Sequence, residues 1–266
     1  MSFQTTFCKT ALSRTGIPGY RYCLNPYIGC SHGCRYCYAD TVLRFSGQGK
    51  KWGKFVAAKV NFPEVLEGEL RRRRTPLGKV LLGTVTDAYQ PVEEKCRLTR
   101  ACLELFVEKW PFIHVDLLTK SDLVLRDLSL LKQLKNCSVG FTVTTAEDAV
   151  AAVIEPGAAP PSARLEAARR LIAEGISVWV FVAPVLPGVG DSPEALEKLA
   201  TALKQAGVKE ADFDPLNPYP AAVQRLETAY RERFPWALKH LKQYLSDTRG
   251  YTRILAERFK TALRKT

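Results

Sequence analysis

The sequence predicts an α/β fold: a partial, open β/α barrel of about six βα units with a C-terminal helical extension. From Lys79 onward, apolar runs alternate with helical patterns, which is typical of βα units and a parallel sheet. Six units are fewer than the eight of a closed barrel. The length of 266 residues, with 46% hydrophobic and 25% charged residues, suits one globular domain. We expect a single domain over 1–266, with a core at about 20–217 and the helical extension at about 221–266.

The predicted strands are short and rich in apolar and β-branched residues. One lies near Tyr20 to Leu24, and the others cover 79–86, 112–119, 137–144, 176–185 and 208–216. A weaker alternation over 54–62 predicts a further short strand.

Four helical patterns separate the later strands, over 94–110, 122–136, 162–175 and 192–207. In the last, Ser192 and Pro193 supply start signals and Gly207 a stop signal. Parallel sheets of this kind place their chemistry in the loops that leave the carboxyl ends of the strands. Functional side chains are therefore expected at 84–90, Lys120, 142–145 and 184–191.

Charge is concentrated at the two ends of the chain. Residues 1–80 hold 14 Lys/Arg against 4 Asp/Glu, and residues 225–266 hold 11 against 4, within a total net charge of +12. Basic regions attract polyanions, nucleic acid above all. A solvated basic surface is the plainer explanation, so nucleic acid is a possible partner that charge alone does not establish.

The cysteine content indicates metal or redox chemistry. No apolar run is long enough to cross a bilayer, and the first residues lack the apolar stretch of a secretory signal. We therefore expect a cytoplasmic protein with no membrane partner. In a reducing compartment, eight cysteines point to metal binding rather than to disulfides.

Three of these cysteines, Cys30, Cys34 and Cys37, follow the spacing C-x3-C-x2-C. Clustered thiolates select zinc or an iron–sulfur cluster. A zinc site would need a fourth ligand, for which His32 and Cys23 are the nearest candidates. Three ligands on a four-iron cluster would instead leave one iron open to a substrate.

The spacing, with Tyr36 before the third cysteine, resembles the radical S-adenosylmethionine (radical SAM) superfamily. The likeness extends to its spore photoproduct lyase-related branch through LNPYIGCSHGCRYCYA (24–39), TDAYQPVE (86–93), LTKSDLVLRDL (118–128), FTVTT (141–145) and APVLPG (183–188). These segments occur in chain order over most of residues 20–190.

This resemblance implies a 4Fe-4S cluster held by Cys30, Cys34 and Cys37, with S-adenosyl-L-methionine bound at the open iron. One electron from the cluster would cleave the sulfonium to methionine and a 5′-deoxyadenosyl radical that abstracts a hydrogen atom from the substrate. The protein would orient these groups and exclude water. A reductase, or an electron donor of the ferredoxin or flavodoxin type, is implied as a partner.

The resemblance also implies residues that contact S-adenosylmethionine. Tyr36 and Tyr38 would flank the cluster, with Tyr38 near the adenine, although both also suit an aromatic core. Thr86 corresponds to a hydroxyl at the methionyl part, and Lys120 to a lysine near the carboxylate or ribose. The threonines at 142 and 144 correspond to a hydroxyl at the ribose, and ordinary strand packing explains them equally well.

One position departs from the lyases, which carry a cysteine as hydrogen-atom donor just before the TD dipeptide. Here that residue is Val85, which has no weakly held hydrogen. We therefore expect related radical chemistry on another substrate, with nucleic acid as the first candidate, rather than thymine-dimer repair. Two alternatives remain at this point: a zinc-stabilised nucleic-acid-binding protein without catalysis, and an iron–sulfur protein that only transfers electrons.

Overall fold

A seven-stranded sheet dominates the computed structural model, which describes residues 2–45 and 52–265. Its strand order is β10-β9-β8-β7-β6-β3-β2. All neighbours are parallel except β2, which pairs antiparallel with β3. The strands are β2 (Ser13–Arg14), β3 (Tyr22–Leu24), β6 (Val80–Leu82), β7 (His114–Thr119), β8 (Asn136–Thr142), β9 (Ser177–Val185) and β10 (Glu210–Pro215). The six parallel strands confirm the predicted partial barrel.

The register of the sheet separates a core face from an inner face. Leu24, Leu82, Leu117, Val139 and Val178 stand side by side on five successive strands, and all belong to the main hydrophobic core. Because successive side chains of a strand point to opposite faces, the residues between these face the concave side of the sheet. The open barrel therefore has a packed outside and a hollow inside.

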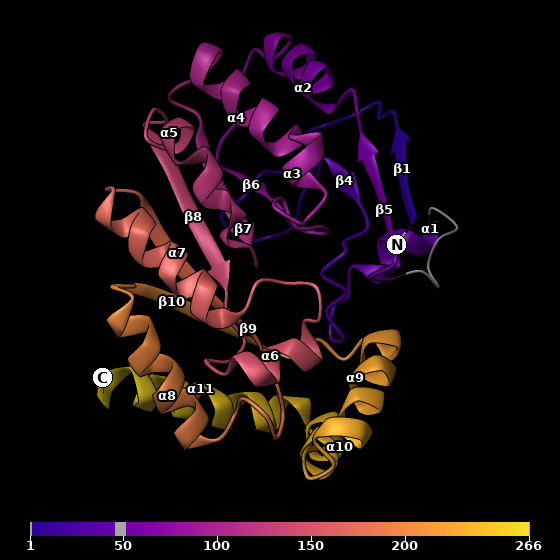
Figure 1. The fold of residues 1–266 in the computed structure, drawn as a ribbon, viewed down its shortest axis with the longest axis vertical. Coiled ribbons are helices and arrows are strands. Elements are labelled where there is room, and N and C mark those ends of the chain that lie inside the picture. The colour runs from indigo at the N-terminus through magenta and orange to yellow at the C-terminus, as the bar shows by residue number, and fades with distance from the viewer. Residues whose placement is uncertain (1, 46–51, 266) are drawn as a thin grey trace.

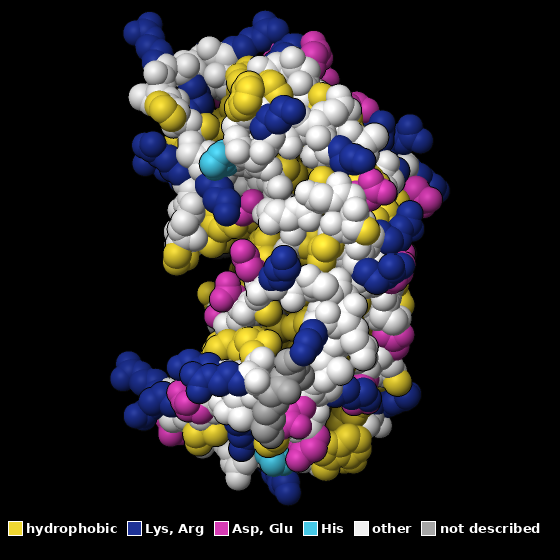
Figure 2. All heavy atoms as spheres, turned by 90° about the vertical axis from the view of Figure 1, so that its left-hand side faces the viewer, with side chains coloured by type: hydrophobic (Ala, Val, Ile, Leu, Met, Phe, Trp, Pro, Cys, Tyr) yellow, Lys and Arg dark blue, Asp and Glu magenta, His cyan; other side chains and the backbone are white. Residues whose placement is uncertain are grey.

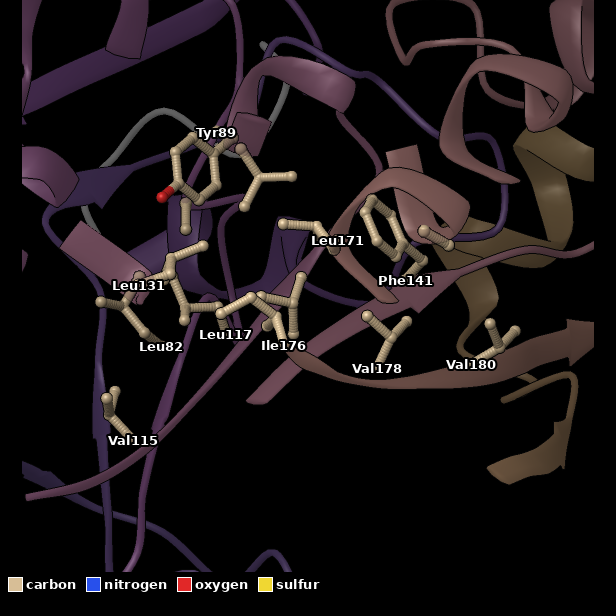
Figure 3. Packing of buried hydrophobic residues seen from close by; sticks show 14 of the residues in the cluster. Leu82, Tyr89, Val115, Leu117, Leu131, Phe141, Leu171, Ile176, Val178 and Val180 are labelled. Atoms are coloured by element: carbon tan, nitrogen blue, oxygen red, sulfur yellow. The ribbon is translucent and has the colours of Figure 1, made fainter. Parts of the chain in front are cut away.

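Helices cover the core face in Figure 1. They are α4 (Leu98–Lys109), α5 (Leu128–Leu131), α7 (Pro161–Ala173) and α8 (Pro193–Gln205), preceded at α5 by the 3₁₀ helix η2 (Asp122–Asp127). Figure 3 shows Leu131 and Leu171 directed at Leu117 and its neighbours, and all three are fully buried. Full burial of such a side chain contributes roughly 1.5–3 kcal/mol.

A second, three-stranded sheet lies beside the first, in the order β1-β5-β4. Its strands are β1 (Ser2–Thr6), β5 (Phe55–Lys59) and β4 (Tyr27–Ile28). β5 confirms the weak strand signal over 54–62, whose last residue begins α2 (Phe62–Arg71). This sheet supports the loop that carries the three cysteines, since β4 leads directly into that loop.

The predicted helix over 94–110 is wrong in one respect, because it is two helices, α3 (Glu93–Cys96) and α4. Arg97 between them adopts a left-handed conformation, with φ of 51°. The buried carboxylate of Glu93 accepts the backbone N–H groups of Thr99 (3.0 Å) and Arg100 (3.2 Å), which have no intrahelical partner at the start of α4. Glu93 thus caps the start of α4, and the left-handed turn at Arg97 brings the two helices into the position for this contact.

The remaining helices are α1 (Asp40–Phe45), α6 (Asp148–Ile154), α9 (Pro220–Arg233), α10 (Ala237–Ser246) and α11 (Thr248–Lys265). The last three confirm the predicted extension. α11 packs on the barrel, where the rings of Phe213 and Phe259 lie 4.7 Å apart. α9 packs against the cysteine loop, with Leu226 and Tyr230 in the same cluster as Cys34. None of the helices in 2–45 and 52–265 combines the length and apolar character needed to span a membrane.

Candidate active site

The three cysteines of the motif line one cavity at the carboxyl ends of the strands. Cys30, Cys34 and Cys37 lie in the loop between β4 and α1, on a cavity of about 210 Å³. The opposite wall comes from the loop after β6, from Lys120 after β7 and from Thr142 at the end of β8. Chain segments that are distant in sequence therefore meet at one edge of the sheet.

Glycines allow the loop to pack closely on its surroundings. Gly29 has φ of +79°, and a Cβ there would lie 2.3 Å from the carbonyl oxygen of Phe55 in β5. A Cβ on Gly157 would lie equally close, at 2.3 Å, to the carbonyl oxygen of Ser31. The loop is therefore held between β5 and the turn after α6, where only glycine fits.

Polar side chains then fix the loop backbone. Buried Gln90 accepts the Ser31 N–H (2.9 Å) and donates to the Gly29 carbonyl (3.3 Å). Trp52 donates its indole N–H to the Cys34 carbonyl (3.1 Å), and Arg225 of α9 donates to the Cys37 carbonyl (2.6 Å). These bonds satisfy the backbone, so the three thiols are available to the cavity.

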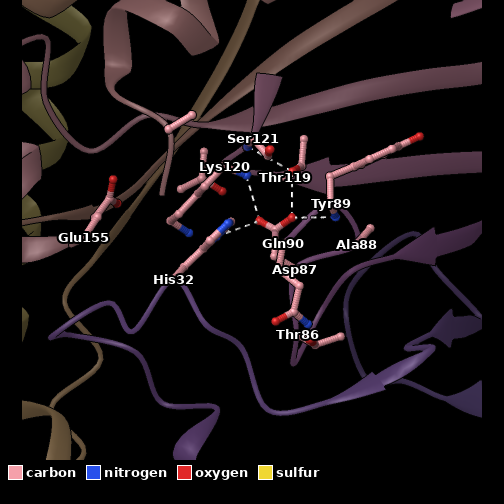
Figure 4. A network of polar contacts seen from close by, with 12 residues as sticks. His32, Thr86, Asp87, Ala88, Tyr89, Gln90, Thr119, Lys120, Ser121 and Glu155 are labelled. Carbon is pink, nitrogen blue, oxygen red and sulfur yellow. Dashed lines mark hydrogen bonds and ion pairs between the residues drawn. The ribbon is translucent and has the colours of Figure 1, made fainter. Parts of the chain in front are cut away.

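Asp87 organises the opposite wall, as Figure 4 shows. Its carboxylate accepts the N–H groups of Tyr89 (2.8 Å) and Lys120 (2.7 Å) and the hydroxyl of Thr119 (2.7 Å). It also lies 3.4 Å from Nδ1 of His32 in the cysteine loop. Burial raises the pKa of Asp87, but His32 and the hydrogen bonds outweigh burial and hold the pKa well below its usual range. Asp87 thus joins the cysteine loop to the strand that carries Lys120.

The second network lies behind the cysteine loop. Tyr36 donates its hydroxyl to Glu155, which pairs with Arg164 at 2.5 Å. Glu155 and Arg164 are both almost fully buried. Arg164 also donates to the carbonyls of Thr142 (2.9 Å) and Ala159 (2.7 Å). This network ties the middle of the C-x3-C-x2-C segment to the end of β8.

Lys120 places a positive charge at the thiols. Its ammonium lies 5.7 Å from the centre of the Tyr36 ring. Burial lowers the pKa of Lys120, but Cys34 and Glu155 outweigh burial and raise it, so the side chain is charged. Burial raises the pKa of the Cys34 thiol well above its ordinary value, and the charge of Lys120 acts in the opposite direction. A lysine here stabilises negative charge on the cysteine side of the cavity.

The residues predicted to contact S-adenosylmethionine are mostly brought together. Tyr36, Tyr38, Thr86, Lys120 and Thr142 all line the cysteine cavity. Their roles toward the cofactor stay predictions. Thr86 also has a structural task, because its hydroxyl donates to the Gly29 carbonyl (2.6 Å).

The remaining predicted residue, Thr144, is not among the cavity-lining residues. It is buried, and its hydroxyl donates to Glu155 (3.2 Å). The pattern FTVTT did not distinguish the two threonines, but β8 ends at Thr142, so Thr144 lies beyond the strand and is directed at Glu155. Thr142 is therefore the better candidate for a cofactor contact.

A larger groove of about 1160 Å³ continues from the cysteine cavity along the concave face of the sheet. We call it the inner groove. The two hollows share Tyr38, Thr84, Leu118, Phe181 and Asp214 in their walls. Tyr38 is 40% exposed, and its ring stacks on Tyr219 with centroids 6.1 Å apart. A substrate in the inner groove would therefore lie directly beside the cysteine cavity.

Several contributors were missed in the sequence. Glu155 and Arg164 gave no signal, because nothing in the chain pattern pairs a residue after α6 with one in α7. Asp214, near the end of β10, and Asn217, just after it, also line the cysteine cavity. Their position at the end of the last predicted strand could have identified them, by the same rule that singled out Lys120.

The donor set fits an iron–sulfur cluster better than zinc. Within the described ranges, no three His, Cys, Asp or Glu side chains are placed to bind one metal ion. His32 is directed at Asp87, and Cys23 accepts a hydrogen bond from Asn25 (3.6 Å) outside the cavity lining. A zinc site would need four ligands around one point. In a four-iron cluster the cysteines bind different irons, so three thiols spread over one cavity wall suit it.

Comparisons with known proteins agree with this geometry. The family model described as the radical SAM superfamily matches residues 24–203. The chain is 35% identical over 183 residues to an uncharacterized protein of Methanocaldococcus jannaschii, covering 69% of this chain and 67% of that protein. It is 34% identical over 216 residues to an uncharacterized protein of Mycobacterium tuberculosis, covering 78% of this chain and 63% of that one. The chain belongs to the radical SAM superfamily and is a radical SAM enzyme, so a 4Fe-4S cluster and S-adenosylmethionine are its implied cofactors.

Among solved structures, the fold is similar to spore photoproduct lyase. A mutant of that lyase with bound AdoMet and dinucleoside spore photoproduct superimposes with a TM-score of 0.64 at 18% identity, covering 86% of this chain and 66% of the lyase. The chain is also 26% identical over 180 residues to the radical SAM Nalpha-GlyT isomerase of Pseudomonas phage M6, covering 66% of this chain and 36% of that protein. It thus spans about two thirds or less of the length of these relatives.

Proposed function

We propose that this radical SAM enzyme abstracts a hydrogen atom from a nucleobase or its sugar in a nucleic-acid substrate. The observation that carries the proposal is the continuity of the cysteine cavity with the inner groove through five shared wall residues. A 4Fe-4S cluster held by the three cysteines would supply, together with S-adenosylmethionine, the 5′-deoxyadenosyl radical. The chain's own residues then have to hold the substrate close to that cavity.

The lining of the inner groove supports a nucleobase as the group that enters. Tyr38 and Phe181 stand at the junction, and Tyr20 and Trp179 lie further along. Aromatic rings of this kind stack with bases, whatever their sequence. Enzymes that do chemistry on a base take it out of the stack into such a pocket.

One residue of the cavity wall argues against the reaction of the spore photoproduct lyases. Val85 lines the cavity, and its backbone N–H donates to Asn25 (3.1 Å). A valine offers no thiol hydrogen to a product radical. The proposal is therefore hydrogen abstraction without a cysteine donor at this position.

A structural neighbour supports the substrate class. Spore photoproduct lyase has been solved with a bound dinucleoside spore photoproduct. The basic ends of the chain, which together carry most of its positive charge, suit a polyanionic partner.

Isotope transfer tests the proposal. Cluster-loaded enzyme is incubated without oxygen with dithionite, S-adenosylmethionine and uniformly deuterated DNA or RNA, single-stranded or duplex. The 5′-deoxyadenosine formed is then analysed by mass spectrometry. Deuterium in the 5′-deoxyadenosine, absent with the Cys34→Ala variant, is expected for at least one nucleic acid. If 5′-deoxyadenosine forms but carries no deuterium with any of the four nucleic acids (single-stranded or duplex DNA, single-stranded or duplex RNA), the substrate class is overturned and the radical chemistry stands.

A further inference from the structure

A third hollow adjoins the active site and is lined by two arginines that form no ion pair within the described residues. It lies between the segment after β10 and helix α11 and measures about 690 Å³. It shares Asp214, Pro215 and Asn217 with the cysteine cavity. Arg249 and Arg253 line its far side, and we call it the arginine groove.

Arg249 and Arg253 lie one turn apart on α11, so both side chains project from the same face of the helix. Both are exposed. Thr248 and Thr252 also line the groove, together with the less polar Pro215, Leu216 and Tyr244. The hydroxyl of Thr252 donates to the Thr248 carbonyl (2.7 Å), which fixes that turn of the helix.

The two guanidinium groups form no ion pair within the part of the chain that the structure describes. Three other arginines of the C-terminal region do have acidic groups close by. Arg225 pairs with Asp40, Arg231 with Glu227, and Arg258 lies near Asp191. The charges of Arg249 and Arg253 are therefore available to a ligand. A guanidinium offers a fork of donors that matches phosphate oxygens.

The inner groove has the opposite character. Glu210, Asp212 and Asp214 are alternate residues of β10, and all three line it. Asp116 also lines it, but Lys79 (2.7 Å) and Tyr20 (2.5 Å) engage that carboxylate. Lys135 also lines the groove, but the three carboxylates of β10 outnumber it. They repel a phosphate, so the inner groove favours a neutral base over a phosphodiester.

We propose that the arginine groove binds the phosphodiester backbone of the nucleic-acid substrate next to the nucleotide whose base enters the inner groove. The inference rests on the proposed function and adds the site that holds the strand. Asp214 borders all three hollows and marks the boundary between the two kinds of surface. Figure 2 shows Lys and Arg side chains gathered below the hollow at the left-hand edge of the molecule.

Binding measurements test the inference independently of turnover. A fluorescein-labelled single-stranded oligothymidylate is titrated with cluster-loaded enzyme, and anisotropy gives Kd at several salt concentrations. Arg249→Gln/Arg253→Gln is compared with Arg233→Gln/Lys239→Gln, which removes the same charge from exposed residues outside the groove. Arg249→Lys/Arg253→Lys keeps the charge and removes the fork.

The groove variant is expected to bind about tenfold more weakly. The slope of log Kd against log salt should also fall by about 1.4, because each lost phosphate contact on a single strand reduces it by about 0.7. The control pair is expected to change Kd less than twofold, and the lysine pair to recover part of the affinity. Equal weakening by groove and control variants would overturn the inference, as would equal competition by a polyglutamate of similar length. Deuterium transfer from nucleic acid that persists in such a case would leave the proposed function standing.

Discussion

Replacing Arg164 by methionine removes the guanidinium that pairs with Glu155 in the buried network behind the cysteine loop. The pair is fully enclosed, and its N···O distance is 2.5 Å. Removing one partner of a buried ion pair costs about 3–5 kcal/mol, because the other charge remains without compensation. Glu155 keeps its bonds from Tyr36 and Thr144, whereas the carbonyls of Thr142 and Ala159 lose their donor. We expect a loss of about 4 kcal/mol and a Tm lower by roughly 10 °C.

Chemical and thermal unfolding of the cluster-free protein measures this loss. In Glu155→Gln/Arg164→Met neither charge of the buried pair is left, and the amide retains an acceptor for Tyr36. The double variant is therefore expected to recover about 2 kcal/mol relative to Arg164→Met. If the double variant is no more stable than Arg164→Met, the ion pair is not the cause of the loss.

The pH dependence provides a second check on the same pair. Burial raises the pKa of Glu155, but Arg164 and Lys120 outweigh burial and place the pKa below its ordinary value. This contribution to wild-type stability is therefore present above the unfolded pKa, about 4.3, and is lost as pH falls through the lower folded pKa. Without Arg164, only Lys120 and the hydrogen bond from Tyr36 oppose burial, so the folded pKa of Glu155 is higher than in wild type and its protonation relieves the variant in acid. The stability deficit of Arg164→Met should shrink from pH 7 toward about pH 5, and a constant deficit would refute the reasoning.

Three further predictions concern the cavity itself. Gly29→Ala should destabilise the protein by about 2 kcal/mol in chemical unfolding, because of its positive φ and the close Phe55 carbonyl, and an unchanged midpoint would contradict the role of Gly29. Asp87→Asn should lower the free energy of unfolding by about 2 kcal/mol, because the amide nitrogen of the new asparagine would face a donor at Lys120 or Thr119. A variant as stable as wild type would contradict the role of Asp87 in this network. Lys120→Met should leave the iron content unchanged but weaken S-adenosylmethionine binding about tenfold in calorimetry, and unaltered affinity would remove Lys120 from the cofactor site.

The sequence predicted the parallel strands because each is a short apolar run followed by a helical pattern, and it predicted the cysteine site because three thiols lie within eight residues. Local pattern does not reveal pairings between distant segments. The bond from Gln90 to the cysteine loop and the pairing of Glu155 with Arg164 depend on how β6, α6 and α7 come together in space. The break at Arg97 was missed for a related reason, because α3 ends at a left-handed arginine rather than a glycine and the buried carboxylate of Glu93 caps the start of α4.

The pairing within the small N-terminal sheet and the arginine groove also could not be predicted from the sequence. β1 gains its strand conformation by pairing with β5, more than fifty residues away in the chain. Arg249 and Arg253 looked like other charges of a basic helical extension. Only the packing of α11 against the segment after β10 places them beside the cavity.

The central claim is that Cys30, Cys34 and Cys37 hold a cluster that cleaves S-adenosylmethionine. Anaerobic reconstitution with iron and sulfide, followed by dithionite, S-adenosylmethionine and chromatography for 5′-deoxyadenosine, tests it most directly. Wild type should bind about four irons per chain and form 5′-deoxyadenosine, whereas Cys34→Ala should form none. Zinc in place of iron, or a stable four-iron cluster that leaves S-adenosylmethionine intact, would contradict the account.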